Sequence, residues 1–183
     1  MRRFALRTRT ADLHQKLDDV VGSFDSRAAY ARYLQALAAF RLPLEAALER
    51  ARWPRRWGAW RPLTVGPALK ADLAELNLPL PSWNGLPGFD LGSPDALLGT
   101  AYVLQGAGLG ARVLVSRAEK LGFGAGNGAA HLAAMSNDID GWRTFLALLE
   151  DTVPFQLDRA VVAARFTFGA ALTDFQSHAL AEG

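Results

Sequence analysis

Apolar residues recur along most of the chain at spacings of three and four, the pattern of helices that bury one face. In the first such segment the apolar positions are Leu6, Leu13, Leu17 and Val20, and Gly22 marks its expected end. Further helices are predicted over residues 27–53, 67–77, 94–121, 129–135, 139–150 and from about 154 to the C-terminus. Pro43 is expected to kink or divide the helix over 27–53.

No segment alternates apolar and polar residues with the period of two that is typical of strands, and no internal repeat is visible. The helix that begins at Pro94 has a strong start signal, because Ser93 can cap it and Asp95 places an acid in its first turn. The pattern predicts an all-α fold. At this length we expect a single domain over residues 1–183.

Composition narrows the range of functions. Half of the 183 residues are hydrophobic and the formal net charge is +2, so disorder and a strongly basic nucleic-acid-binding face are not indicated. The absence of cysteine excludes disulfides, thiolate metal sites and cysteine nucleophiles. We find no apolar run of membrane-spanning length and no cleavable leader pattern, so we expect a cytoplasmic protein without a membrane partner.

The stretch GAGLGA, residues 106–111, satisfies the G-x-G-x-x-G/A fingerprint of dinucleotide-binding turns. That fingerprint requires a preceding strand, a helix that opens at the glycines and an acid about 20 residues further on. Here the predicted helix begins a dozen residues before Gly106, and the region near residue 130 is neither acidic nor strand-like. The context therefore contradicts a dinucleotide site.

Two other interpretations of the three glycines remain. They could allow tight helix–helix packing, or they could let a flat ligand approach a loosened or bent helical backbone. Each glycine inside a helix costs about 1 kcal/mol relative to alanine. Gly106, Gly108 and Gly110 do not share one face, which favours the second interpretation.

Of the three histidines, His14 has the most suggestive neighbours. Asp18 lies one helical turn on, where its carboxylate can orient the imidazole as partners of metal-bound histidines do. Arg7 lies two turns back, about 10 Å along the axis, a distance that suits a ligand with a central metal and a carboxylate at its rim. By contrast, we expect His131 to lie at the surface and His178 to be solvated.

Two of these segments together resemble the haem oxygenase (heme oxygenase) family, in particular its bacterial biliverdin-producing members. The first resembles that family's proximal helix and comprises Leu6, Arg7, Thr10, His14, Leu17 and Asp18. The second resembles its distal helix and comprises Tyr102, Val103, Leu104, Gln105, Gly106, Leu109 and Gly110. Further matches in the C-terminal part are Trp142, Arg143, Phe145, Ala164 and Phe168.

The resemblance implies a compact helical fold in which haem lies between the first helix and a kinked, glycine-bearing distal helix. His14 is then the proximal iron ligand and Asp18 its partner, while Gly106, Ala107 and Gly110 lie against the haem face. The resemblance gives the remaining haem contacts to Arg7, Tyr102, Arg143 and Phe168, the first three as partners of the propionates.

The implied activity is the oxidative opening of haem b (heme b), which is both cofactor and substrate, at a meso carbon to give biliverdin, CO and Fe²⁺. O2 is the co-substrate. The electrons come from a ferredoxin with its reductase or from a flavoprotein reductase, and a phytochrome is a possible acceptor of the biliverdin. We expect a monomer with no nucleic-acid partner.

The sequence departs from the family pattern at three places in the distal helix. Ala107 stands where many members carry an aspartate that orders water near the bound oxygen, and where bacterial relatives often have serine. Gln105 replaces a common glutamate, and Ala111 replaces the last glycine of the motif. These departures leave the proton donor unassigned.

Two rival hypotheses follow from the same residues. A non-catalytic haem or tetrapyrrole carrier or sensor would keep the ligand site without the oxygen chemistry. A non-haem di-iron oxidase would need carboxylates and histidines that converge from several helices. The candidates for that site are Glu45, Asp72, Glu75 and His131, but no Glu-x-x-His pair is present.

Overall fold

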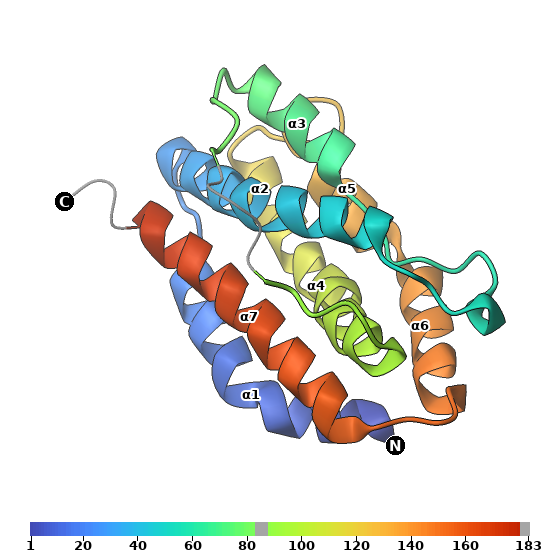
Figure 1. Cartoon of the computed structure of the whole chain (residues 1–183). Helices are drawn as coiled ribbons and strands as arrows, with labels where there is room; N and C mark the ends of the chain where they lie inside the picture. The colour runs from blue at the N-terminus through green and yellow to red at the C-terminus, as the bar shows by residue number, and fades with distance from the viewer. Residues whose placement is uncertain (83–87, 180–183) are drawn as a thin grey trace.

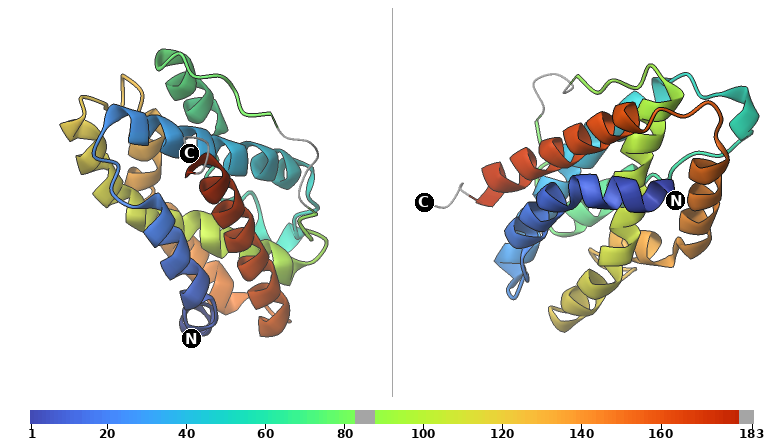
Figure 2. Two further views of the ribbon diagram at one scale, coloured as in Figure 1. Left: turned by 90° about the vertical axis from the view of Figure 1, so that its left-hand side faces the viewer. Right: turned by 90° about the horizontal axis from the view of Figure 1, so that it is seen from below.

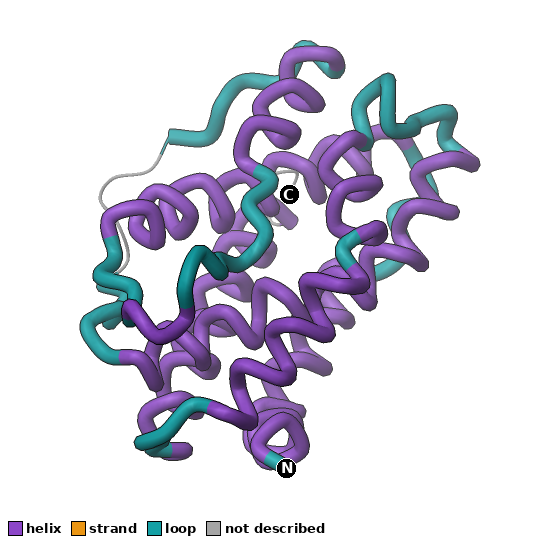
Figure 3. Tube along the Cα trace, turned by 90° about the vertical axis from the view of Figure 1, so that its right-hand side faces the viewer, coloured by secondary structure: helices purple, strands orange, loops and turns teal. Residues whose placement is uncertain are grey.

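The structure is a computed structural model that describes residues 1–82 and 88–179. The elements are α1 (Arg2–Val21), α2 (Arg27–Arg50), the 3₁₀ helix η1 (Arg55–Trp57), α3 (Gly66–Glu75), α4 (Pro94–Lys120), α5 (Ala130–Asn137), α6 (Ile139–Asp151) and α7 (Leu157–Ala179). Over the described ranges the chain forms helices and loops, with isolated backbone bridges around Gly124 and no strand (Figure 3). The all-α prediction is confirmed. The part of the last predicted helix beyond Ala179 lies outside the described residues.

Helix α7 runs alongside α1 and packs against α1, α2 and α4 (Figures 1 and 2). The crossing of α4 and α7 is very close at Gly99, where a Cβ atom would overlap the backbone carbonyl of Ala160. Because only glycine allows this approach, the two helices meet backbone to backbone. This contact fixes the position of α4 relative to α7, the helix against which α1 also packs.

Two serine caps and one glycine mark helix ends where the sequence predicts them. The side-chain oxygen of Ser26 accepts a hydrogen bond from the amide of Ala29, and Ser93 caps α4 in the same way through the amide of Ala96. Helix α1 ends at Gly22, whose φ of 56° lies in the left-handed region.

Two predicted breaks do not interrupt the helices. Helix α2 runs unbroken through Pro43, and it ends at Arg50 rather than at residue 53. Helix α4 keeps its hydrogen bonding from Pro94 to Lys120 in spite of its glycines, so the kink implied by the resemblance remains a prediction.

Helix α1 buries little of its surface. Leu6 and Thr10 are fully buried, while Leu13, Leu17 and Val20 are half-buried and pack against the core. This confirms the predicted apolar side of the helix. Most of the remaining positions, including His14, are exposed, whereas Arg2, Arg3, Ala5 and Val21 are half-buried.

The short helices receive their N-terminal caps from distant acids. The Glu45 carboxylate on α2 accepts hydrogen bonds from the amides of Val65 and Gly66 at the start of α3. In turn, Asp72 on α3 accepts the amides of Ala130 and His131 at the start of α5. A negative charge at a helix N-terminus satisfies free amides and complements the helix dipole, so each of these helices is anchored by an acid on an earlier helix.

Among the described residues, α4 is long and apolar enough to cross a membrane by length and composition. Core helices of globular proteins meet the same criterion, and α4 packs against α5, α6 and α7. Its apolar character is accounted for by these contacts along its buried side.

Candidate functional site

His14 lies on the exposed side of α1 and keeps one ring nitrogen open. Its Nδ1 is 3.0 Å from Oδ2 of Asp18, one turn on, as the spacing predicts, and the two side chains are 60% and 61% exposed. Nε2 has no partner among the described residues. An imidazole that is oriented through Nδ1 and has a free Nε2 has the arrangement typical of metal-ligating histidines.

Phe168 on α7 supports this imidazole. The edge of the Phe168 ring meets the His14 ring, with 5.6 Å between centroids and an angle of 69° between planes. Phe168 itself is buried in the core, so it is a fixed surface against which the histidine rests. The structure therefore brings the predicted residues His14, Asp18 and Phe168 together.

Tyr102 joins α4 to α1 near this histidine. Its phenol is half-buried, which raises its pKa, and hydrogen bonding with Thr10 and the positive charge of Arg7 oppose that rise. Since Thr10 lies one turn before His14, the Tyr102 face of α4 is directed towards the His14 helix. Arg7 is exposed and forms no ion pair within the described ranges.

The three glycines of α4 have different surroundings. A Cβ atom on Gly110 would meet nothing within 4 Å, and one on Gly106 would make only an ordinary contact, 4.0 Å from the ring of Trp142. A Cβ on Gly108, however, would lie 2.8 Å from the carbonyl oxygen of Met135 on α5. The packing interpretation is confirmed for Gly108, whereas the approach of a flat ligand to the open backbone at Gly106 and Gly110 stays a prediction.

An apolar surface continues from Tyr102 along α4. Gly106, Leu109 and Val113 lie close to the Tyr102 side of the helix by their spacing. Leu109 and Val113 are 51% and 56% exposed, and Ala107 is exposed as well. A flat apolar ligand could cover this surface and reach the helical backbone, because Gly106 and Gly110 have no side chains in the way. The residues present therefore fit a porphyrin.

The structure adds Trp142 to the site. Its ring lies beside Gly106 and 6.4 Å from the Tyr102 ring, centroid to centroid. The neighbouring Arg143 forms an ion pair with Asp140 at 3.3 Å and is 75% exposed, and its contact with a propionate stays a prediction. The apolar period of α6 is a signal that could have favoured Trp142, because it places the tryptophan near the buried Phe145.

His131 is buried rather than at the surface, which corrects the expectation from its glycine-rich flank. Its side chain is fully buried, with Nδ1 2.7 Å from Oδ2 of Asp72 and Nε2 3.4 Å from the hydroxyl of Tyr33. Burial lowers its pKa, although the Asp72 carboxylate opposes the shift. The neutral ring can donate to Asp72 and accept from Tyr33, so neither nitrogen is open.

Three of the four candidate ligands of a di-iron centre have other partners, whereas Glu75 is exposed. Glu45 pairs with Arg41 at 2.8 Å and caps α3, while Asp72 binds His131 and caps α5. In the described part of the chain, no three histidine or carboxylate side chains are grouped so that they could hold a metal ion. Glu45, Asp72 and His131 thus serve the packing of the helices.

Gln105 also has a structural role. Its Oε1 accepts a hydrogen bond from the amide of Leu63 at 3.1 Å, and its Nε2 donates to Asp138 at 3.3 Å. The side chain is buried and faces away from the open glycines. Its amide satisfies a donor and an acceptor at once, which a carboxylate in the same place could not do.

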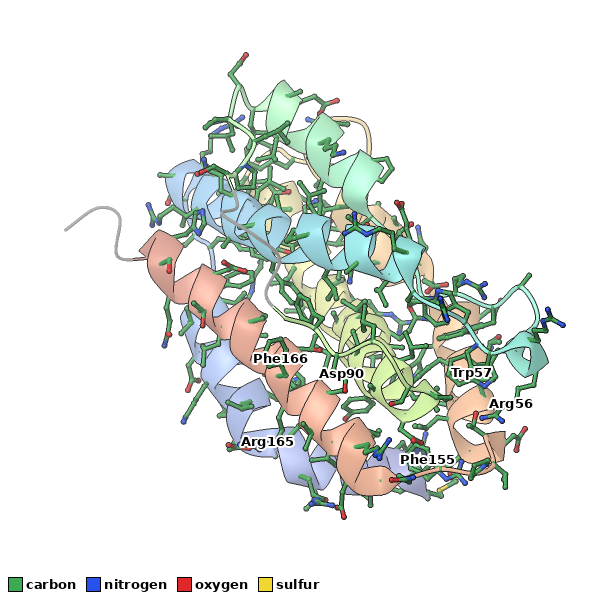
Figure 4. All side chains as sticks on the ribbon, viewed as in Figure 1. Arg56, Trp57, Asp90, Phe155, Arg165 and Phe166 are labelled. Atoms are coloured by element: carbon green, nitrogen blue, oxygen red, sulfur yellow. The ribbon has the colours of Figure 1, made fainter. Side chains whose placement is uncertain are left out.

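Two cavities lie outside this site. One of about 570 Å³ is lined by Arg27, Leu76 and Phe123 among others. Another of about 320 Å³ is lined in part by Asp90 and Phe166, which Figure 4 labels beside α7. The His14 and glycine surfaces belong to neither, and their residues are exposed rather than enclosed.

The site therefore combines an exposed histidine that has one free nitrogen with an open glycine backbone in an all-α fold. No family model matches the chain. It is 32% identical over 146 residues to the heme oxygenase PigA of Pseudomonas aeruginosa, a match that covers 77% of this chain and 73% of that protein. The chain belongs to the haem oxygenase family and is a haem-degrading enzyme.

The fold agrees with this assignment. The structure superposes on the NO- and CO-bound heme oxygenase of Neisseria meningitidis with a TM-score of 0.71, over 100% of this chain and 95% of that one. The sequence identity in that comparison is 21%, so the likeness concerns the fold. The predicted haem oxygenase-like architecture is confirmed.

Proposed function

We propose that the chain holds haem b between α1 and α4, with Nε2 of His14 as the proximal ligand of the iron. The observation that carries this assignment is the free imidazole nitrogen on α1, joined through Thr10 and Tyr102 to the side of α4 that bears the open glycines. Once bound, haem supplies both the iron at which O2 is reduced and the meso carbon that is oxidised.

The side chains around His14 would orient the substrate. Asp18 holds Nδ1, which fixes the ring orientation and strengthens the Nε2 donor, and Phe168 limits rotation of the ring. Arg7 is the proposed partner of one propionate, because its charge is exposed and lies on the side of Tyr102. Tyr102 can donate a hydrogen bond to the same group.

The distal surface would act through shape. Gly106 and Gly110 let the helical backbone lie close to the macrocycle. There the backbone excludes water and leaves room for O2 towards one edge of the ring only. Ala107 has no polar atom in its side chain, so it cannot order water by hydrogen bonding. We therefore assign no side chain on α4 as the proton donor.

The wider assignments follow the same proposal. Biliverdin, CO and Fe²⁺ are the proposed products, with electrons from a ferredoxin or a flavoprotein reductase and with a phytochrome as a possible acceptor of the biliverdin. A monomer in the cytoplasm is the proposed state of the protein.

The test is an absorption spectrum with hemin, taken before and after reductant and O2 are added. A catalyst forms a Soret band and then bleaches it as a bilin accumulates. A protein that keeps its Soret band under these conditions is a carrier, and that result would overturn the proposed activity of this chain.

A further inference from the structure

Arginines are concentrated in the segment from Arg50 to Arg61. This stretch, RARWPRRWGAWR, contains five arginines and no acidic residue, although the whole chain carries a formal net charge of only +2. All five arginines are exposed. The local charge is therefore strongly positive on a nearly neutral protein.

Most of these arginines lack the partners that arginines have elsewhere in the chain. Arg9, Arg41, Arg143 and Arg165 form ion pairs with Asp158, Glu45, Asp140 and Asp12. Within residues 1–82 and 88–179, no ion pair or hydrogen bond involves the side chains of Arg50, Arg52, Arg55 or Arg56. Their positive charge is not neutralised within the described protein.

Three tryptophans hold this segment in place. The rings of Trp53, Trp57 and Trp60 pack against one another with centroids about 6 Å apart, and Arg61 lies over the Trp53 ring. In Figures 1 and 4 the η1 segment projects from the end of the bundle beside α6. The arginines are thus displayed on a packed aromatic base rather than on a loose loop.

A chain of neighbouring aromatic rings leads from this base to the proposed haem surface. Trp60 stacks on Phe145 at 5.9 Å, and Phe145 stacks on Trp142 at 5.7 Å, measured between ring centroids. Trp142 then lies beside Gly106 and 6.4 Å from Tyr102. The aromatic base therefore connects the arginine surface with the distal helix without a gap.

We propose that the surface formed by Arg50–Arg61, the arginine surface, is the docking site of an acidic electron-transfer protein. The inference rests on the proposed function. The docked donor loses one electron, and the ferric iron of bound haem gains it. The electron tunnels along the packed rings from Trp60 to Trp142, and no ring is itself oxidised.

The charge and the place of the surface both favour this partner. Unpaired arginines attract an acidic protein at long range and accelerate its encounter, an effect that salt weakens. The charge would also attract a nucleic acid, but nucleic-acid binding does not account for the chain of rings that leads to the proposed haem surface. Nucleic-acid binding is therefore kept as an outcome of the test.

The test of docking uses the haem-free protein and an acidic [2Fe–2S] ferredoxin as probe, measured by calorimetry at low and high salt. The double substitution Arg55→Glu and Arg56→Glu should weaken binding by about tenfold or more and reduce its salt dependence. The matched control, Lys70→Glu with Arg159→Glu, makes the same change of charge at exposed positions on α3 and α7 and should bind as the unaltered protein does.

Equal affinity in all three proteins would overturn the docking site. Binding of a single-stranded oligonucleotide through the same arginines, without ferredoxin binding, would overturn the choice of partner. Ring opening supported by ascorbate separates the docking proposal from the proposed function. The double variant should retain this activity, because ascorbate does not need the docking site. If the unaltered protein lacks it, the proposed function is refuted instead.

The route is tested through Phe145, which is buried between two tryptophans. Phe145→Leu should leave ferredoxin affinity unchanged but slow the reduction of bound haem by reduced ferredoxin in stopped-flow measurements, and Phe145→Tyr should restore the rate. An unchanged rate in the leucine variant would exclude the ring chain as the route.

Discussion

The chain contains two histidine–aspartate pairs that share one chemistry and differ in their surroundings. His14 and Asp18 lie one turn apart on the exposed side of α1, with 3.0 Å between Nδ1 and Oδ2. His131 and Asp72 come from different helices, lie 2.7 Å apart and are buried. In the first pair Nε2 is open, whereas in the second Tyr33 occupies it.

This difference separates a pair that is able to ligate a metal from a structural pair. A histidine can ligate a metal only through a nitrogen that no other group occupies, and the exposed pair retains such a nitrogen. In the buried pair, Asp72 and Tyr33 occupy both ring nitrogens of His131. Desolvation lowers the pKa of His131, so its neutral form is favoured. A histidine–aspartate contact alone does not identify a ligand.

The largest effect is expected from His14→Ala. Without an axial ligand, the Soret band of the hemin complex should shift or disappear, and bilin formation should fall to background. Thermal stability should hardly change, because the side chain is 60% exposed. An unchanged spectrum together with normal bilin formation would remove His14 from the site.

His131→Ala should show the opposite behaviour. Removal of the ring leaves the Asp72 carboxylate buried and only partly compensated, at a cost of about 3–5 kcal/mol in the free energy of unfolding. Urea denaturation measures this loss. Hemin binding by the remaining folded protein should keep its axial-ligand spectrum, and a lost spectrum would mean that the buried pair serves the haem as well.

Asp18→Ala should weaken the function of His14 without removing it. Loss of the carboxylate that orients a metal-bound histidine costs about 10–100-fold in affinity or activity. Hemin titration and the rate of bilin formation measure the effect. Gln15→Ala is a suitable control on the same helix, because its side chain bonds Asp19 instead; an equal loss in both variants would contradict the specific role of Asp18.

The glycines of α4 offer a smaller, matched comparison. Gly110→Ala places a methyl group in open space, so the protein should be stabilised by up to about 1 kcal/mol while hemin binds less well. Gly108→Ala places it 2.8 Å from the Met135 carbonyl and should destabilise the fold. If the two variants behave alike in denaturation and in hemin titration, the division of the glycines is wrong.

The smallest effect is a pH dependence of stability from His131. Because its pKa is lowered in the folded protein, the unfolded chain takes up a proton first, near pH 6.5. This contribution is complete above about pH 6.5 and is lost as the pH falls below it, by at most about 1.4 kcal/mol per pH unit. The slope should vanish in His131→Phe, whereas His14→Ala should retain it.

Local signals made much of the architecture predictable. The serine caps at Ser26 and Ser93, the apolar side of α1 and the contact between His14 and Asp18 all depend on residues within a few positions of one another. Helical spacing alone determines such neighbours. The fold class and the contact between His14 and Asp18 followed from these signals.

The remainder depended on contacts between distant segments. Nothing near His131 in the sequence indicates that it forms a buried contact with Asp72, which lies 59 residues earlier in the chain. The three glycines are alike in sequence, and only the position of α5 distinguishes Gly108 from Gly106. Trp142 matches the family pattern in the sequence, but only the packing of α6 against α4 places its ring beside Gly106.

The distant caps have a consequence for the order of assembly. Helices α3 and α5 contain 10 and 8 residues, and helices of that length are marginal on their own in water. The start of α3 depends on Glu45 of α2, and the start of α5 depends on Asp72 of α3. The three helices therefore form a sequence in which each completes the next, so loosening of α2 should release both short helices, whereas fraying of α5 leaves the earlier ones intact.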